Sequence, residues 1–265
     1  MGAHGRKGKP ARQNHGNFAI FASTMADFLN IFLLAILGSF ILRTVGFGFG
    51  IFIMTVLPFL MPSYGEATCL SGMLAMTTSI FVVYRMRHYL NWAHLLPILT
   101  TFLVVSSLTI FSLKEIDDHV LRKILGVVLI VIALYFTFFS HRIKLRPNTT
   151  TQVSAGTLSG LLGGFFGMQG PPAVLYFLST EKDKDHYMAI IQAYLLAGNT
   201  GMLIVRAMNG FLTPTVGIDY LYGLGGVAIG ALLGTVAFNR IPQQTFEYIV
   251  YAYIAVSGIM ILVTA

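Results

Sequence analysis

Long apolar stretches dominate this sequence and leave few folds open to it. A helix needs about 20 apolar residues to cross the hydrocarbon of a bilayer, and eight segments near or above this length follow one another. They cover residues 28–61, 67–84, 92–111, 121–139, 153–178, 187–208, 214–238 and 245–263. Each is continuously apolar, whereas strands of a membrane barrel alternate lipid-facing and lumen-facing residues. The pattern predicts an all-α integral membrane protein with about eight hydrophobic helical segments.

Composition supports a membrane location over a soluble one. Hydrophobic residues make up 55% of the chain and charged residues only 10%, whereas a soluble domain carries about 25% charged residues. The net charge of +7 comes from basic residues in tails and loops, where they act as orientation signals at an anionic membrane surface. We therefore expect membrane lipid as the surroundings and no nucleic-acid partner. Whether the protein forms a homo-oligomer stays open.

The chain divides into two similar halves. Each half opens with a glycine-broken segment and continues with three unbroken ones, and aligning Gly48 with Gly170 also brings Thr77 onto Asn199 and Thr78 onto Thr200. Duplicated halves with a broken helix at the same place are typical of secondary transporters. The expected organisation is a disordered basic N-terminal tail at 1–17, a first transmembrane repeat at 18–140, a basic linker at 141–152 and a second repeat at 153–265.

Basic residues in the loops indicate the orientation of a membrane protein. If all eight segments cross, the tail, the linker and Arg206 share a side that holds about ten Lys and Arg residues, against about six opposite. If the first and fifth segments re-enter instead, the count is about eight against eight. The count favours both termini in the cytoplasm, at a cell membrane that we expect to be a bacterial inner membrane. Whether those two segments span, and so whether the repeats are parallel or inverted, stays open.

Two glycine-rich stretches carry the main functional signal: Arg-Thr-Val-Gly-Phe-Gly-Phe-Gly-Ile at 43–51 and Gly-Gly-Phe-Phe-Gly-Met-Gln-Gly-Pro-Pro-Ala at 163–173. Each glycine costs a helix about 1 kcal/mol relative to alanine, so several together break it. Proline suits a first helical turn, which predicts a half-helix beginning near Gly170 and Pro171, and a similar start at Gly50. Two helix N-termini at membrane depth would form an anion site. The candidate substrate-binding residues here are Gly48, Gly50, Gly167, Gly170 and Pro171. The alternative is that these glycines only let helices pack closely.

Arg43 is a basic residue well inside an apolar segment. An ionisable group within the membrane is a functional candidate by default, and a guanidinium presents a planar donor fork that suits carboxylate, sulfonate or phosphate oxygens. Arg43 is therefore a candidate ligand of an anion. The alternatives are that it caps the carbonyl end of the helix before Gly46 or extends to the surface.

Five further polar residues lie within apolar segments. Gln169 lies in the second break and can both donate and accept hydrogen bonds, so it is a candidate for substrate contact or for local backbone satisfaction. Asn199, Thr200, Thr77 and Thr78 lie in mid-segment. They are candidates for lining a transport path, although such groups more often hydrogen-bond between neighbouring helices.

Enzymatic chemistry is not expected. The seven histidines do not pair at metal-ligand spacing, and no hydrolase elbow or pair of catalytic carboxylates occurs, so we predict no metal and no cofactor. The Gly-x-Gly-x-Gly run lacks the preceding strand that a nucleotide-binding motif needs. Asp27, Asp219 and Glu247 lie near segment ends, which does not support a carboxylate proton relay in mid-membrane.

The second glycine-rich stretch is similar to that of the TauE/SafE family of sulfite exporters and sulfonate uptake permeases. The match is good over 163–178, with its Gly-Met-Gln-Gly-Pro core, and looser over 46–60. Ala-Thr-Cys-Leu at 67–70 resembles the family's step into the next helix, and Phe49 and Gln169 replace glycines common in the family.

This resemblance covers residues 28–263 and implies a secondary permease that moves sulfite, sulfonates or other organosulfur anions by alternating access. The anion would be held at paired half-helix N-termini. The residues themselves argue only for a small anionic substrate. An anion channel, a non-enzymatic membrane partner subunit and a membrane-embedded enzyme are the alternatives.

Overall fold

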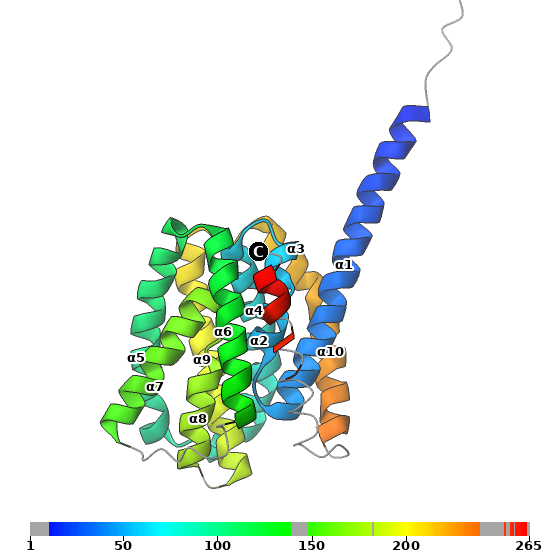
Figure 1. Cartoon of the computed structure of the whole chain (residues 1–265). Coiled ribbons are helices and arrows are strands. Elements are labelled where there is room, and N and C mark those ends of the chain that lie inside the picture. The colour runs from blue at the N-terminus through cyan, green and yellow to red at the C-terminus, as the bar shows by residue number, and fades with distance from the viewer. Residues whose placement is uncertain are drawn as a thin grey trace, which may run out of the picture.

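A computed structural model describes residues 11–138, 148–181 and 183–238, together with 252, 255, 256 and 258–263. Every regular element among these residues is a helix (Figure 1). The order is α1 (Ala11–Val45), α2 (Phe49–Ile53), α3 (Leu57–Leu60), α4 (Tyr64–Met86), η1 (Arg87–Tyr89), α5 (Trp92–Ser112), η2 (Leu113–Glu115), α6 (Asp118–Phe138), α7 (Thr149–Phe166), α8 (Gly170–Thr180), α9 (Lys184–Met208) and α10 (Pro214–Phe238).

The all-α membrane fold predicted from the sequence is confirmed. Within the described part of the chain, four helices are long and apolar enough to cross a membrane, by length and composition: Tyr64–Tyr89, Trp92–Glu115, Asp185–Met208 and Pro214–Val236. A shorter apolar run covers Phe28–Thr44. The count of eight segments stays a prediction, because most of the eighth lies outside the described residues. Of the predicted disordered tail, residues 11–17 belong to α1 and the rest is not described.

Side-chain caps fix where several helices begin. Ser63 accepts a hydrogen bond from Glu66 N–H at the start of α4, and Asp183 accepts from the first N–H groups of α9. Asn148 and Thr151 form a reciprocal capping box at the start of α7. Such caps satisfy N–H groups that have no partner within the helix. The cap at Asn148 makes the last residues of the expected linker part of α7.

Two faces of the helical bundle can be defined from contacts between helix ends. On the Glu66 face, Thr213 donates to Glu66 at 3.1 Å and Tyr64 N–H donates to Asp118 at 3.0 Å, so α4, α6 and α10 begin there. On the Glu181 face, His94 contacts Glu181 at 2.6 Å, so α5 begins where α8 ends. The direction of each helix is given relative to these two faces.

The first broken segment is a helical hairpin. Phe28 packs on Tyr222 and Arg43 on Gly234, so α1 runs parallel to α10, away from the Glu66 face. The chain then turns back through α2 and α3, and Phe59 of α3 meets Arg122 near the start of α6. The segment therefore ends on the face where it began, as the blue α1 and the returning α2 and α3 show in Figure 1.

The second broken segment is also a hairpin, but it starts from the opposite face. Gln152 near the start of α7 donates to the hydroxyl of Tyr176 near the end of α8 at 2.9 Å, so both lie towards the Glu181 face. This resolves the question left open by the sequence: both broken segments return. The all-spanning arrangement that favoured cytoplasmic termini is not adopted. With hairpins the basic residues divide about eight against eight, so sidedness stays a prediction.

Helices from one half of the chain pack against helices from the other half. Glycines 226, 230 and 234 of α10 pack on the backbone of α1, and glycines 156, 160 and 164 of α7 pack on α5. Small residues at four-residue spacing allow this close approach in membranes. Between the two pairs, α4 packs on α9 at the centre. This exchange is the arrangement that an inverted repeat would produce, and the repeat itself stays a prediction.

Candidate functional site

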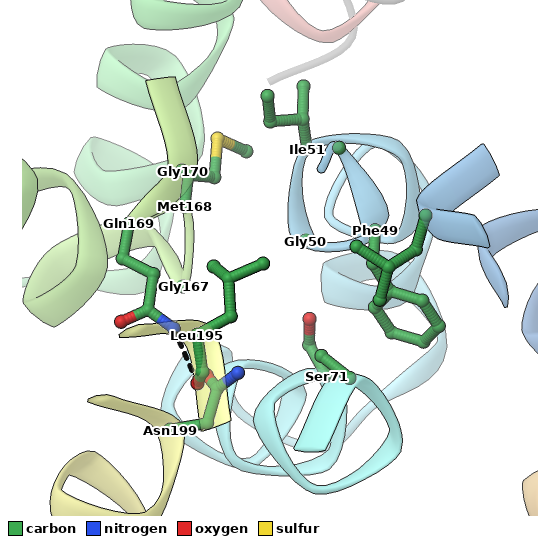
Figure 2. A pocket seen from close by; sticks show the side chains of 13 residues that line it. Phe49, Gly50, Ile51, Ser71, Gly167, Met168, Gln169, Gly170, Leu195 and Asn199 are labelled. Atoms are coloured by element: carbon green, nitrogen blue, oxygen red, sulfur yellow. Dashed lines mark hydrogen bonds between the residues drawn. The ribbon is translucent and has the colours of Figure 1, made fainter. Parts of the chain in front are cut away.

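A small cavity lies where the two breaks meet between α4 and α9 (Figure 2). Its volume is about 30 Å³, enough for one or two water molecules. It is lined by Leu42, Gly48, Phe49, Gly50, Ile51, Ser71, Ala75, Gly167, Met168, Gln169, Gly170, Leu195 and Asn199. Six residues predicted from the sequence are among them, namely Gly48, Gly50, Gly167, Gln169, Gly170 and Asn199. The other five, Arg43, Pro171, Thr77, Thr78 and Thr200, are not.

The first break depends on two glycines with positive φ. Gly46 has φ +90° and Gly48 has φ +99°, a region that favours glycine because a Cβ is strained there. The helix α2 that follows has five residues, and its first intrahelical bond is Phe52 N–H to Gly48 O at 2.9 Å. The N–H groups of Phe49, Gly50 and Ile51 come before that bond and have no intrahelical acceptor. This short helix therefore contributes backbone donors rather than a large dipole.

The second break has one such glycine and a longer helix after it. Gly167, with φ +68°, ends α7, and its N–H donates to Gly163 O at 3.0 Å. Gln169 then starts α8, which has eleven residues with Pro171 in its first turn, as predicted. Prolines lack an N–H group, so Gly170 is the main backbone donor at this end. Pro171 itself lines a separate apolar pocket between α6, α7 and α8.

The two breaks touch through backbone atoms. A Cβ added to Gly50 would collide with the carbonyl oxygen of Gly167. A Cβ on Gly170 would instead lie 3.6 Å from its nearest neighbour, Phe47, which is ordinary contact. The close approach that requires glycine therefore occurs at Gly50. At Gly170 the space admits a Cβ.

Polar side chains from both central helices reach the cavity. The Ser71 hydroxyl of α4 points into the space below Gly50, and the Asn199 amide of α9 lies beside it (Figure 2). Both side chains are buried. Gln169 donates from Nε2 to Leu195 O at 3.2 Å, and its Oε1 is buried without a partner among the described residues. The cavity thus combines a hydroxyl, amides and backbone N–H groups.

Helix α9 covers the carbonyl ends at both breaks. Gln192 donates from Nε2 to Gly46 O at 2.9 Å. Arg206 donates from Nη2 to Gly163 O at 2.9 Å and to Gly164 O at 3.3 Å. Because these two acceptors are bonded by donors from α9, the N–H groups at the two breaks are available to the cavity, beside the carbonyl oxygen of Gly167 that lies against Gly50. The local surroundings therefore favour a bound group that accepts hydrogen bonds.

Arg206 was missed as a buried residue by the sequence analysis, which counted it with the loops. Its side chain is only 1% exposed. The signal that could have found it is its spacing of seven residues from Asn199, which places both side chains on one face of α9. The length of the apolar segment placed Arg206 near a helix end, whereas in the fold its side chain is buried where it meets the carbonyls of Gly163 and Gly164.

Arg43 lies outside the cavity. It is half-buried, and its Nε donates to the Thr235 hydroxyl of α10 at 2.9 Å. The hydrogen bond joins the last turn of α1 to its parallel neighbour. The proposed role of Arg43 as a direct ligand has no support from this geometry.

The three threonine candidates join helices instead of lining the cavity. Thr77 bonds the Tyr220 hydroxyl at 2.8 Å, and Thr78 bonds the Ser39 hydroxyl at 3.2 Å. Thr200 donates to Leu196 O at 2.8 Å and contacts the sulfur of Met76. These contacts match the alternative in which such groups hydrogen-bond between helices.

Comparisons with known proteins agree with this architecture. The family model described as sulfite exporter TauE/SafE matches residues 31–261. A relative from Methanocaldococcus jannaschii, named as a probable membrane transporter protein, is 26% identical over 212 residues, which cover 75% of each chain. No solved structure matches the chain.

Proposed function

The chain belongs to the TauE/SafE family of membrane transporters, and from this premise we propose that it is a secondary permease for small anions, with sulfite, sulfonates and related organosulfur anions as its substrates. Membership of this family makes the protein a transporter and not an enzyme. The substrate class is carried from the family's description and from the chemistry of the cavity.

The observation that carries the proposal is the distribution of donors and acceptors around the cavity. Backbone N–H groups from Phe49 to Ile51 and from Gly170 lie at the two breaks, while the carbonyls of Gly46 and Gly163 are bonded by α9. Helix N-termini bind oxyanions through such N–H groups. The Ser71 hydroxyl and the Asn199 amide add donors on the opposite wall. These groups suit the oxygen atoms of a sulfite or sulfonate.

The dimensions of the cavity favour a mechanism that involves movement. A volume of about 30 Å³ holds water but not a sulfonate, so substrate binding requires the lining to separate. The two hairpins start from opposite faces, and each contributes one break to the cavity. Movement of one hairpin at a time would open the same cavity first to one face and then to the other, which is alternating access around a fixed site.

An anion channel is the second candidate. A channel requires a continuous path, whereas the cavity is small and apolar side chains such as Phe49 and Leu195 help to line it. This favours a transporter. The two differ in kinetics, because a transporter saturates with substrate concentration and a channel shows flux without such saturation.

Two measurements on the purified protein test the proposal. Thermal unfolding is followed with sulfite, methanesulfonate, sulfate or acetate, because a ligand at 100 times its Kd stabilises the folded state by about 2.7 kcal/mol. Uptake of the stabilising anion is then measured in proteoliposomes. We expect stabilisation by sulfite and methanesulfonate and saturable uptake. No stabilisation by either would contradict the substrate class, and uptake without saturation would favour the channel.

A further inference from the structure

Among the described residues, Arg206 carries a buried positive charge with no acidic partner. Its side chain is 1% exposed, its Nε lacks a partner, and the ion pairs of the described residues, His94–Glu181 and His186–Asp183, do not include it. Two carbonyl oxygens satisfy only Nη2. An uncompensated charge in a protein interior is strongly unfavourable, so a structural cap alone would be served as well by a neutral donor. The first break shows this, since Gln192 caps Gly46 without any charge.

The guanidinium lies directly behind the cavity wall. Gly72 of α4 lies against both Arg206 and Asn199, since a Cβ placed on Gly72 would lie 3.6 Å from Asn199 Oδ1 and 3.7 Å from Arg206 Nη1. Asn199 lines the cavity, whereas Arg206 does not. The charge is therefore close enough to act on the cavity through an intervening amide, in an interior that screens it weakly.

The other groups around Arg206 leave its charge in place. Tyr64 and Cys69 interact with it electrostatically, and both carry side chains that are neutral at pH 7. The carboxylates of Glu66 and Asp118 lie towards the Glu66 face, where they accept hydrogen bonds from Thr213 and from Tyr64 N–H, and neither forms an ion pair with Arg206. A positive potential therefore extends from Arg206 towards the cavity.

We propose that Arg206 is the residue that makes the cavity selective for anions: its charge stabilises a negatively charged substrate at the breaks without touching it. This inference rests on the proposed function, and it adds the source of charge selectivity. Arg206 is a specificity residue rather than a ligand. Arg206 Nη1 and the cavity-lining Asn199 Oδ1 both lie within 4 Å of the Gly72 Cβ position. We expect a charge this near the cavity to change anion affinity by on the order of tenfold to a hundredfold. It should change the affinity for a neutral molecule of the same shape very little.

The first experiment compares two probes of similar shape. Methanesulfonate is an anion and methanesulfonamide is neutral, and binding of each is measured on purified wild-type protein, Arg206→Gln and Arg206→Lys. We expect the preference for methanesulfonate to fall tenfold to a hundredfold in Arg206→Gln and to persist in Arg206→Lys, which keeps the charge. Thr200→Val, on α9 but outside the cavity, should leave the preference unchanged. An equal loss of both probes in Arg206→Gln, or no loss of preference, would overturn the inference.

A second pair of variants leaves Arg206 and its carbonyl contacts in place. Gly72→Asp positions a carboxylate beside both the guanidinium and Asn199 and so cancels the positive potential at the cavity, while Gly72→Asn adds a side chain of the same shape without charge. We expect Gly72→Asp to lose the preference for methanesulfonate and Gly72→Asn to retain it. Equal preference in the two variants would contradict the inference, and this pair decides the question if Arg206→Gln does not fold.

Failure of the proposed substrate class can be distinguished from failure of the Arg206 inference. Acetate and acetamide form a second anion–neutral pair, measured on the same variants. If wild-type protein binds acetate but no sulfonate, the substrate class is wrong and the Arg206 inference is tested with acetate. If wild-type protein prefers neither anion over its neutral counterpart, Arg206 does not confer selectivity.

Discussion

The two breaks turn the chain by different means. The first passes through Gly46 and Gly48, both with positive φ, and continues into helices of five and four residues. The second uses Gly167 alone and continues into the eleven-residue α8, which Pro171 helps to start. A neutral amide, Gln192, caps the first, and the buried Arg206 caps the second.

The two breaks therefore differ in how easily their backbone can change conformation. Two glycines and two very short helices give the first break few intrahelical hydrogen bonds, so its backbone can change at low energetic cost. The second break is braced by a charged side chain, by Gln169 and by a longer helix. We infer that the first hairpin supplies movement and that the second, held by Arg206 of α9, supplies the more rigid wall of the site.

Labelling from one side tests the largest difference, the faces from which the hairpins start. In a Cys69→Ala background, cysteines at Thr150 and Asp185 flank the second hairpin, and both positions are exposed. The hairpin structure places both on the Glu181 face, so an impermeant thiol reagent should label both from one side of the membrane. A cysteine at Glu115, on the other face, should label only from the opposite side. Labelling of Thr150→Cys and Asp185→Cys from opposite sides would show that the segment spans.

Alanine substitutions should distinguish the two breaks by how well each tolerates a Cβ. Gly50→Ala places a Cβ against the carbonyl oxygen of Gly167, whereas Gly170→Ala meets only ordinary contacts. Overpacking typically costs about 1–3 kcal/mol, and here the clash also pushes the two breaks apart. We expect Gly50→Ala to lose most transport and Gly170→Ala to stay within about twofold of wild type, as measured by proteoliposome uptake and thermal unfolding. The reverse order would place the tight contact at the second break.

Much of this arrangement could be predicted from the sequence, because it depends on local chemistry. Glycine clusters and Pro171 act on their own backbone, so the breaks and the start of α8 were found. The sequence does not predict that each hairpin returns to the face where it started, since a broken apolar segment of this length can cross the membrane or fold back. The burial of Arg206 and the outward position of Arg43 depend on which helix packs against each, and no local pattern encodes that.

The smallest effect is expected at Arg43. Its hydrogen bond to Thr235 is exposed and lies outside the cavity, so its net contribution to stability is at the lower end of about 0.5–1.5 kcal/mol. Arg43→Lys and Arg43→Gln should both bind methanesulfonate nearly as wild type does, with slightly lower melting temperatures. Thr235→Val is the matched control and should lower the melting temperature similarly. A fall in affinity with Lys and a much larger fall with Gln would restore Arg43 as a direct ligand.

The central claim is that the anion binds in the cavity between the breaks, and a binding isotherm on Asn199→Asp tests it most directly. The change keeps the shape of the side chain and places a negative charge on the cavity wall. Thr200→Val, at the next position on α9 but outside the cavity, is the control. Repulsion between two charges near 4 Å is worth about 4 kcal/mol at an effective dielectric constant of 20. We predict that methanesulfonate affinity falls a hundredfold or more in Asn199→Asp and by less than about twofold in Thr200→Val. Wild-type affinity in Asn199→Asp would show that the anion binds elsewhere.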